Sequence, residues 1–258
     1  MRFFLAPLLL AAAVPAFAQG VEQHWSFDVH TFGPTFEGRF QDHSGSNPVD
    51  VDMKHDLGLA KDQTKVGFGL EYQGPRFGLE FSRDEEDYRG SQVVSRQITI
   101  NGQTFAASTL VHSRLKAVSN TLNWTVRCVT WPQFWIGLDL GARVTQMEIN
   151  ADGADPFTNL GATAHYKTTL PVPQVGPSVG FEALANRVVA RAYYHFLRYK
   201  GATYNHPGAD LRVFPVSWLG IRVFTDGEHF KVPRNSINSD VEANLDRTGT
   251  GLGVVLRY

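Results

Sequence analysis

The chain has 258 residues, and its 24 Lys and Arg against 25 Asp and Glu give a formal net charge of -1. Balanced charge argues against a nucleic-acid partner, which would select a basic excess. The single cysteine, Cys128, excludes an intramolecular disulfide framework. Beyond the N-terminal segment there is no apolar run of about 18 residues, which excludes a transmembrane helix. Aromatic residues make up 12% of the chain, and short runs of alternating apolar and polar residues recur along it, so we expect an all-β protein.

Residues 1–18 have the layout of a secretory signal peptide. Arg2 supplies a short positive start, an apolar run extends from Phe3 to about Val14, and Ala16-Phe17-Ala18 forms a small-x-small cleavage site. The apolar run is too short to span a bilayer. We therefore expect cleavage after Ala18 and a mature protein, residues 19–258, that forms a single domain outside the cytoplasm.

The first expected strands alternate strictly. In HWSFDVHTF, which begins at His24, the apolar side chains share one face, and Asp28 and His30 lie on the other. After a polar loop, KVGFGLEYQ repeats the pattern with Glu71 on its polar face. The tripeptide GPR predicts a tight turn into FGLEF, which carries Glu80. Each segment therefore predicts a strand with one apolar face and one small or charged face.

The middle of the chain leaves this pattern and then resumes it. Residues 89–112 are strand-like but too polar for a membrane face, and Asn101-Gly102 is a strong type I′ hairpin signal. We expect an extracellular hairpin there, projecting beyond the bilayer. The segments NTLNWTVRC and FWIGLDLGARV then alternate again, and a long loop around NADGADPFTNLGAT follows. The polar face of these two strands carries Arg127, Asp139 and Arg143.

The last third of the chain predicts further strands in PQVGPSVGFEA, RVVARAYYHF, PVSWLGIRVF, EHFKV and the final segment. We expect a turn at LAN, a loop around KGATYNHPGAD and a turn at Asp226-Gly227. The polar face of these strands carries Glu182, Arg187, Arg191, His195 and Arg222.

Together these segments predict a transmembrane antiparallel up-and-down β-barrel of about ten strands, in a range of about 8 to 12. An even number brings both ends of the barrel to the periplasmic side. Because every backbone N–H and C=O must be paired in hydrocarbon, the last strand is expected to pair with the first and close the sheet.

The chain ends on GLGVVLRY, in which Leu252, Val254, Leu256 and Tyr258 share the apolar face. A signal peptide, alternating strands and an aromatic last residue resemble Gram-negative outer-membrane β-barrels, whose last strand is read by the barrel-assembly machinery. More narrowly, the ordered set VDVDMKHDLGL, FGLEYQGPRFGLEFSRDEED, RQITINGQTF and VHSRL looks like a widespread, mostly uncharacterised family of small outer-membrane barrels. The resemblance implies an outer-membrane location, with outer-membrane lipid, lipopolysaccharide and the assembly machinery as partners. It implies no cofactor and no assigned reaction.

The expected lumen carries charges of both signs. Ten strands enclose an interior only slightly wider than that of eight, which side chains fill, and an unpaired buried charge is costly. We therefore expect the charges to pair across the lumen and plug it, which leaves a structural or surface-interaction role. The alternative is a narrow pore biased to anions by an excess of arginine. The charge network is predicted to contain Asp28, Glu71, Glu80, Asp139, Arg143, Glu182, Arg187, Arg191, Arg222 and Arg257.

A third possibility is a hydrolase that acts on lipid A or peptides. Its candidate residues are His206 with Asp210, or His112 and Ser113 with Asp84. No spacing ties these residues into a dyad or triad, so we predict no catalytic residues. The acidic segment RDEEDYR has the oxygen ligands for a divalent cation bridging lipopolysaccharide, but a charged rim that keeps the barrel end soluble is the simpler expectation. We therefore predict no metal site.

Overall fold

The computed structural model describes the chain except for residues 1–22, 43–48, 60–64, 101, 155–160 and 234–240. The expected signal peptide, residues 1–18, lies outside the described residues. In the described part, no helix is long and apolar enough to cross a membrane. The strands are β1 (His24–Asp42), β2 (Val49–Asp52), β3 (Lys65–Gln73), β4 (Phe77–Val93), β5 (Ile98–Ile100), β6 (Gln103–Phe105), β7 (Leu110–Thr130), β8 (Phe134–Ala154), β9 (Gly161–Ala183), β10 (Val188–Tyr199), β11 (Ala202–Val216), β12 (Leu219–Val232) and β13 (Val241–Arg257).

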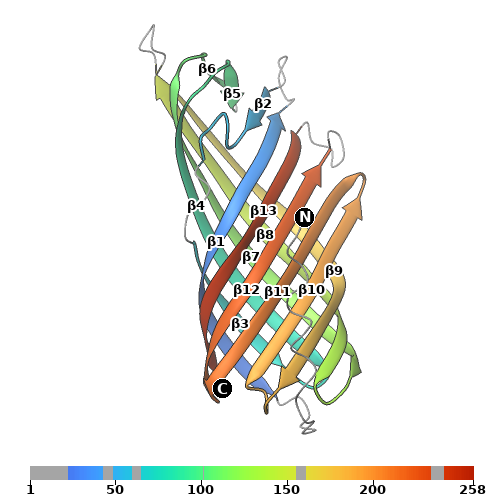
Figure 1. Ribbon diagram of the computed structural model, residues 1–258. Helices are drawn as coiled ribbons and strands as arrows, with labels where there is room; N and C mark the ends of the chain where they lie inside the picture. The colour runs from blue at the N-terminus through green and yellow to red at the C-terminus, as the bar shows by residue number, and fades with distance from the viewer. Residues whose placement is uncertain (1–22, 43–48, 60–64, 101, 155–160, 234–240) are drawn as a thin grey trace, which may run out of the picture.

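Ten of these strands form a closed antiparallel ring in the order β1-β3-β4-β7-β8-β9-β10-β11-β12-β13, and β13 pairs back with β1. The closing ladder extends from Ser26 opposite Arg257 to Asp42 opposite Val241. At its periplasmic end, Trp25 and Tyr258 exchange both backbone hydrogen bonds at 2.8 Å. Figure 1 shows β13, in red, lying beside β1, in blue, with the C-terminus at the lower end of the barrel. The predicted fold, strand number and first-to-last closure are confirmed.

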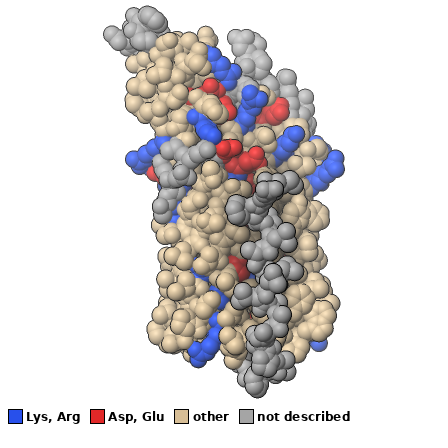
Figure 2. All heavy atoms as spheres, in the orientation of Figure 1, with Lys and Arg blue, Asp and Glu red and all other residues tan. Residues whose placement is uncertain are grey.

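An apolar belt surrounds the half of the barrel that contains the C-terminus. It consists of the exposed outward side chains of the strands within this half. On the face drawn in Figure 2, this half is largely free of charged residues, while Lys, Arg, Asp and Glu gather on the other half. An exposed apolar surface of this extent is the one that a β-barrel turns to hydrocarbon. The belt includes Trp25, Phe27, Phe68, Leu79, Leu122, Trp124, Leu138, Leu140, Ile221, Val223, Leu252, Val254 and Leu256.

The strands extend past the belt into the extracellular half, and a separate apolar core closes the extracellular end of the barrel. The segment from Met53 to Leu59 and the β5–β6 hairpin pack on the inner faces of β4, β7 and β8, where Tyr88, Val111 and Leu115 are fully buried. The expected hairpin over 89–112 is therefore narrower than its sequence suggested, because β4 continues to Val93 and β7 begins at Leu110. The hairpin packs against the end of the barrel.

Two expected loops of the last third are wrong. The segment KGATYNHPGAD is not a loop, since Lys200 and Gly201 make a tight turn and β11 begins at Ala202. Asp226 and Gly227 lie in the middle of β12 and form no turn. The chain instead reverses before β12 begins, between Val216 and Leu219. The cause is the polar lumen, because inward positions there select the same polar residues that favour turns in other proteins.

Candidate functional site

The centre of the lumen is organised around Asp139, a carboxylate on β8 with 0% exposure. It accepts hydrogen bonds from Thr125 Oγ1 and Ser178 Oγ, both at 2.7 Å. Arg191 Nη2 lies 2.8 Å and His195 Nε2 3.0 Å from its other oxygen. Arg191 also donates through Nη1 to Glu80 on β4 at 2.8 Å. Because β10 is separated from β4 by β9, β8 and β7, Arg191 ties distant walls of the barrel together.

A second group of charges lies beside this centre. Arg212 on β11 bonds Glu71 on β3, and its Nε donates to Asp210 at 2.9 Å. Arg222 on β12 lies 3.2 Å from Asp28 and 3.7 Å from Asp210. The Arg212–Glu71 and Arg222–Asp28 contacts join strands that are not neighbours in the sheet, so they brace the barrel from inside.

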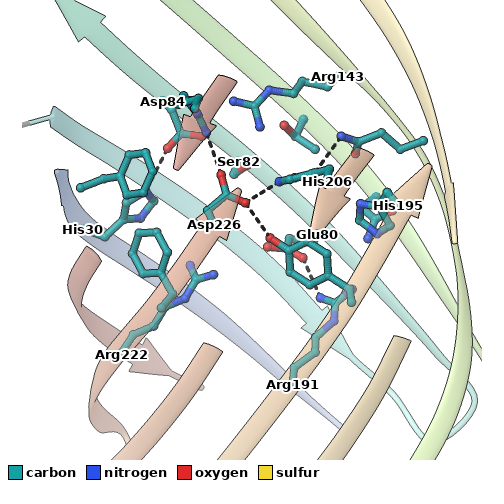
Figure 3. Close-up of a pocket in the computed structure, with 17 residues that line it drawn as sticks. His30, Glu80, Ser82, Asp84, Arg143, Arg191, His195, His206, Arg222 and Asp226 are labelled. Carbon is teal, nitrogen blue, oxygen red and sulfur yellow. Dashed lines mark hydrogen bonds and ion pairs between the residues drawn. The ribbon is translucent and has the colours of Figure 1, made fainter. Parts of the chain in front are cut away.

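Toward the extracellular side, Arg247 on β13 bonds Glu86 on β4 and, at 2.7 Å, Asp226 on β12. Glu228 lies 3.5 Å from both Arg247 and Arg143. All these side chains point inward, and Figure 3 shows Arg143 and Asp226 facing the same small cavity from different strands. This layer therefore closes the lumen on its extracellular side.

Three histidines repeat one arrangement, in which the imidazole contacts a carboxylate that also binds an arginine. His195 shares Asp139 with Arg191. The other two sets are His206 with Asp226 and Arg247, and His30 with Asp28 and Arg222. His30 also contacts Asp84 Oδ1 at 2.9 Å through its second nitrogen. Each of the three imidazoles thus contacts a carboxylate that forms an ion pair with an arginine within the lumen.

Little open space remains at this level. The cavity between the groups of Figure 3 measures about 70 Å³ and is lined mainly by polar side chains. A water molecule occupies roughly 30 Å³ of liquid, so the cavity has room for a few waters between the charged groups.

The structure brings most of the predicted charge network together. Asp28, Glu71, Glu80, Asp139, Arg143, Glu182, Arg191 and Arg222 all point into the lumen, with Glu182 3.5 Å from Arg127. Arg187 was placed wrongly, whereas Arg257 has the predicted inward parity. Arg187 is exposed in the β9–β10 turn and donates to the backbone oxygen of Pro215. Arg257 is half-buried at the periplasmic end, where its guanidinium donates to two turn carbonyls.

Sequence reasoning missed several lumen charges because it placed their segments in loops or in the outer rim. Arg212 and Asp210 belong to the strand that was expected to be a loop, and Asp226 was assigned to a turn. The signal that would have found them is strict alternation, since His206, Asp210 and Arg212 share one parity while Ala209 and Leu211 share the other.

These additions remove the arginine excess on which the anion-selective alternative rested. Among the described inward residues the acids now outnumber the bases. The bases are Lys65, Arg127, Arg143, Arg191, Arg212, Arg222, Arg247 and Arg257, and the acids are Asp28, Glu71, Glu80, Asp84, Glu86, Asp139, Glu182, Asp210, Asp226 and Glu228.

The candidate catalytic sets are not assembled. His206 and Asp210 both point inward but bind other partners, Asp226 and Arg212 respectively. His112 is bonded to Ser91 at 2.7 Å, and Ser113 donates to the backbone of Leu57. Asp84 pairs in register with Ser119 and contacts His30, so it does not meet the His112-Ser113 pair.

The carboxylates of RDEEDYR are divided between the two faces of β4. Asp84 and Glu86 point into the lumen, while Glu85 and Asp87 point outward beside arginines. Hydrogen bonding from Arg114 lowers the pKa of Asp87, which lies outside the belt. Within the described ranges, no group of three or more His, Cys, Asp or Glu side chains is placed to hold a metal ion.

Comparison with known proteins places the fold. No family model matches the chain, and no curated protein matches it. The outer membrane protease OmpT from Escherichia coli is similar in structure, with a TM-score of 0.65 over 94% of this chain and 100% of OmpT at 9% identity. The translocator domain of the autotransporter NalP from Neisseria meningitidis gives 0.47 over 93% of this chain and 90% of that one at 13% identity. The shared fold and the apolar belt together make this chain a bacterial outer-membrane β-barrel.

Proposed function

We propose that the protein is a sealed outer-membrane barrel, with a structural or surface-interaction role exercised by its extracellular half. The observation that carries this proposal is the Glu80–Arg191–Asp139 bridge, which crosses the lumen with 2.8 Å contacts at both ends. A solute moving along the barrel axis would have to break these contacts and leave the charges unpaired, which is costly in a narrow, poorly hydrated interior.

The extracellular half supports the interaction part of the proposal. Its strands extend past the belt and hold the capped end rigidly, since the buried residues around Tyr88, Leu115 and Ile149 form a continuous apolar core. A rigid platform with a charged exterior suits contact with other polar surfaces, including lipopolysaccharide head groups. During biogenesis, the barrel-assembly machinery would read the last strand through the outward residues Leu252, Val254, Leu256 and Tyr258.

We further propose that the lumen histidines serve stability and not catalysis. Each of the three histidines contacts at least one carboxylate that also binds an arginine, which is the arrangement expected of a structural ion pair. In a general base the imidazole would need one nitrogen directed at a substrate, whereas both nitrogens of His30 contact carboxylates.

Solute flux into phospholipid vesicles containing the refolded protein tests the sealed barrel. We expect the uptake of small sugars and small anions to equal that of empty vesicles. Uptake that increases with the amount of folded protein would reject the proposal in favour of a pore. Folding is checked in the same preparation by the change in gel migration on heating.

A further inference from the structure

An apolar chamber of about 630 Å³ lies between the lumen charges and the extracellular cap. Its floor includes Tyr204, whose hydroxyl accepts a hydrogen bond from Gln174 at 2.8 Å, and Gln174 in turn contacts His206 of the polar layer. Its roof includes Met53, a member of the capping core. The volume lies within the range of about 300–1,000 Å³ that is typical of ligand sites. The chamber is therefore large enough for a ligand and distinct from the charged lumen.

The wall of this chamber is open between β9 and β10. The two strands pair from Ala183 opposite Val188 to Val175 opposite Phe196, and beyond that point the described part of β9 pairs only with β8. This seam combines a long strand with one that turns back early, because β9 begins at Gly161 whereas β10 ends at Tyr199. Figure 1 shows β8 and β9 inclined away from β10 and β11 toward the extracellular end.

Three prolines explain why the seam stays open. Pro171, Pro173 and Pro177 share one parity, so their nitrogens point to the same side of β9. The pairing of β9 with β8 is continuous through the three prolines, whereas the pairing of β9 with β10 skips Pro177. The side of β9 to which the proline nitrogens point therefore faces β10. Proline has no N–H to donate and is tolerated at sheet edges for this reason. The open edge of β9 is thus encoded in the sequence.

The chamber passes through this opening to the outside of the barrel. Its lining includes inward residues of β9, such as Leu170 and Val172, and also outward residues of the same strand, Pro171 and Pro173. A cavity closed inside the barrel would be lined by the inward set alone. The chamber therefore opens sideways, through the wall, and not along the barrel axis.

The opening lies at the extracellular margin of the belt. Just below it, Tyr194 and Phe196 of β10 are exposed apolar side chains that face lipid. On the other side of the opening, Pro171 and Pro173 of β9 pair in register with Val144 and Ala142 of β8. These are the last apolar outward positions of β8 before the polar Gln146. The mouth of the chamber thus faces the hydrocarbon of the outer leaflet near its polar surface.

Basic side chains flank the mouth. Arg198 belongs to the chamber lining and is exposed, and three further exposed cations are adjacent in sequence to lining residues: Lys167, Lys200 and Lys231. Glu148 lies in register opposite Lys167, on the β8 side. The charge around the mouth is therefore mainly positive and matches a phosphate or carboxylate group at the membrane surface.

We propose that the chamber binds one acyl chain of an anionic lipid, which enters sideways from the outer leaflet between β9 and β10. The apolar lining takes the chain, and the basic residues at the mouth hold its phosphate or carboxylate head group. Acyl chains are the molecules that fill the space outside the opening, and moving one into an apolar cavity leaves the belt and the charged lumen unchanged. This binding site adds to the sealed barrel and does not depend on it.

Photo-crosslinking in phospholipid vesicles tests the proposal at residue level. The refolded protein is exposed in one arm to a fatty acid with a diazirine in its chain and in the other to lipid A with the same group in one acyl chain. After irradiation the adducts are mapped by peptide mass spectrometry. We expect adducts on inward lining residues, including Leu170, Tyr204 and Phe230, in addition to the belt residues that any membrane lipid reaches. Chamber labelling in one arm or both identifies the source of the chain.

Chamber-filling variants provide the control. Thr168→Trp and Ala243→Phe place large side chains in the cavity, and chamber adducts should fall at least about tenfold, which corresponds to about 1.4 kcal/mol of binding free energy. Belt adducts should not change, and Thr248→Trp, on the outward face of β13, should leave both classes unchanged. The double variant Arg198→Glu, Lys200→Glu should reduce chamber labelling by the acid but not by a neutral diazirine alcohol.

Adducts confined to the belt in the wild-type protein would overturn the proposal, whatever the variants do. Chamber adducts that persist in both filled variants, each shown to be folded by its gel migration, would overturn it as well. Equal labelling by the acid and the alcohol in both the wild type and the charge-reversed variant would overturn the assignment of an anionic head group. A failure here leaves vesicle flux unaffected, so it is distinguishable from failure of the sealed barrel.

Discussion

Removing the Asp139 carboxylate is the sharpest single perturbation of the lumen. In Asp139→Ala, the side chains of Arg191 and His195 lose a partner that no other group replaces, and the hydroxyls of Thr125 and Ser178 lose their acceptor. We expect a marked loss in the free energy of unfolding because a buried cation is left with half of its compensation.

The size of the loss follows from the depth of the pair. Removing one partner of a buried ion pair costs about 3–5 kcal/mol, and we expect a loss of about 3 kcal/mol because Arg191 keeps Glu80. The matched control is Glu85→Ala, since Glu85 and Arg83 are also 2.8 Å apart but with side chains 51% and 40% exposed. An exposed pair contributes about 0–1 kcal/mol. The two losses should therefore differ by about 2 kcal/mol or more.

Urea unfolding of the protein in phospholipid vesicles, followed by tryptophan fluorescence and extrapolated to zero urea, measures both losses. The triple variant Glu80→Leu, Asp139→Leu, Arg191→Met should be more stable than Asp139→Ala, because it removes the cation together with both of its carboxylate partners. If Asp139→Ala costs no more than Glu85→Ala, the lumen charges are solvated as surface charges are, and the reasoning behind the sealed lumen is refuted.

Three further predictions concern the walls and the closure. Gly176→Ala should lower the free energy of unfolding by about 1–3 kcal/mol in the urea assay, because its Cβ would lie 1.9 Å from the backbone oxygen of Tyr194. Leu138→Arg, in the belt, should cost about 2–4 kcal/mol in the same assay. Tyr258→Ala keeps the backbone hydrogen bonds to Trp25 but should lower the fraction of heat-modifiable, folded barrel recovered from cell outer membranes, because it removes the aromatic side chain through which the assembly machinery is proposed to read the last strand.

Each of these predictions has a control or a contrary result. Gly161→Ala lies on the same strand with no atom within 4 Å of its Cβ and should be tolerated. Asn244→Arg, at an outward position beyond the belt, should be close to neutral. Equal losses of stability for Leu138→Arg and Asn244→Arg would show that the belt does not lie in the membrane. Unchanged recovery of folded Tyr258→Ala would show that the aromatic last residue is not needed for assembly.

The fold could be predicted because the two faces of each strand within the belt lie in different surroundings. Between hydrocarbon outside and a charged lumen inside, the period-two pattern of segments such as KVGFGLEYQ and FWIGLDLGARV has one interpretation, and the closure of the last strand on the first follows from backbone pairing. The same alternation placed Asp28, Glu71, Asp139 and Arg191 correctly inside.

The partners within the lumen could not be predicted, because they come from strands far apart in the sequence. The bond between Arg212 and Glu71 joins residues 141 positions apart, and that between Arg247 and Glu86 joins residues 161 apart. Which inward charges meet depends on strand tilt and register, which the alternation of one strand does not fix. The open seam had a sequence signal in the prolines of β9, but its meaning required the early turn after Tyr199.

Single-channel recording in planar lipid bilayers tests the sealed lumen most directly. The folded wild-type protein is predicted to give no reproducible current steps at either polarity, because the Glu80–Arg191–Asp139 bridge crosses its lumen. Reproducible steps of one size from the wild-type protein would contradict the account.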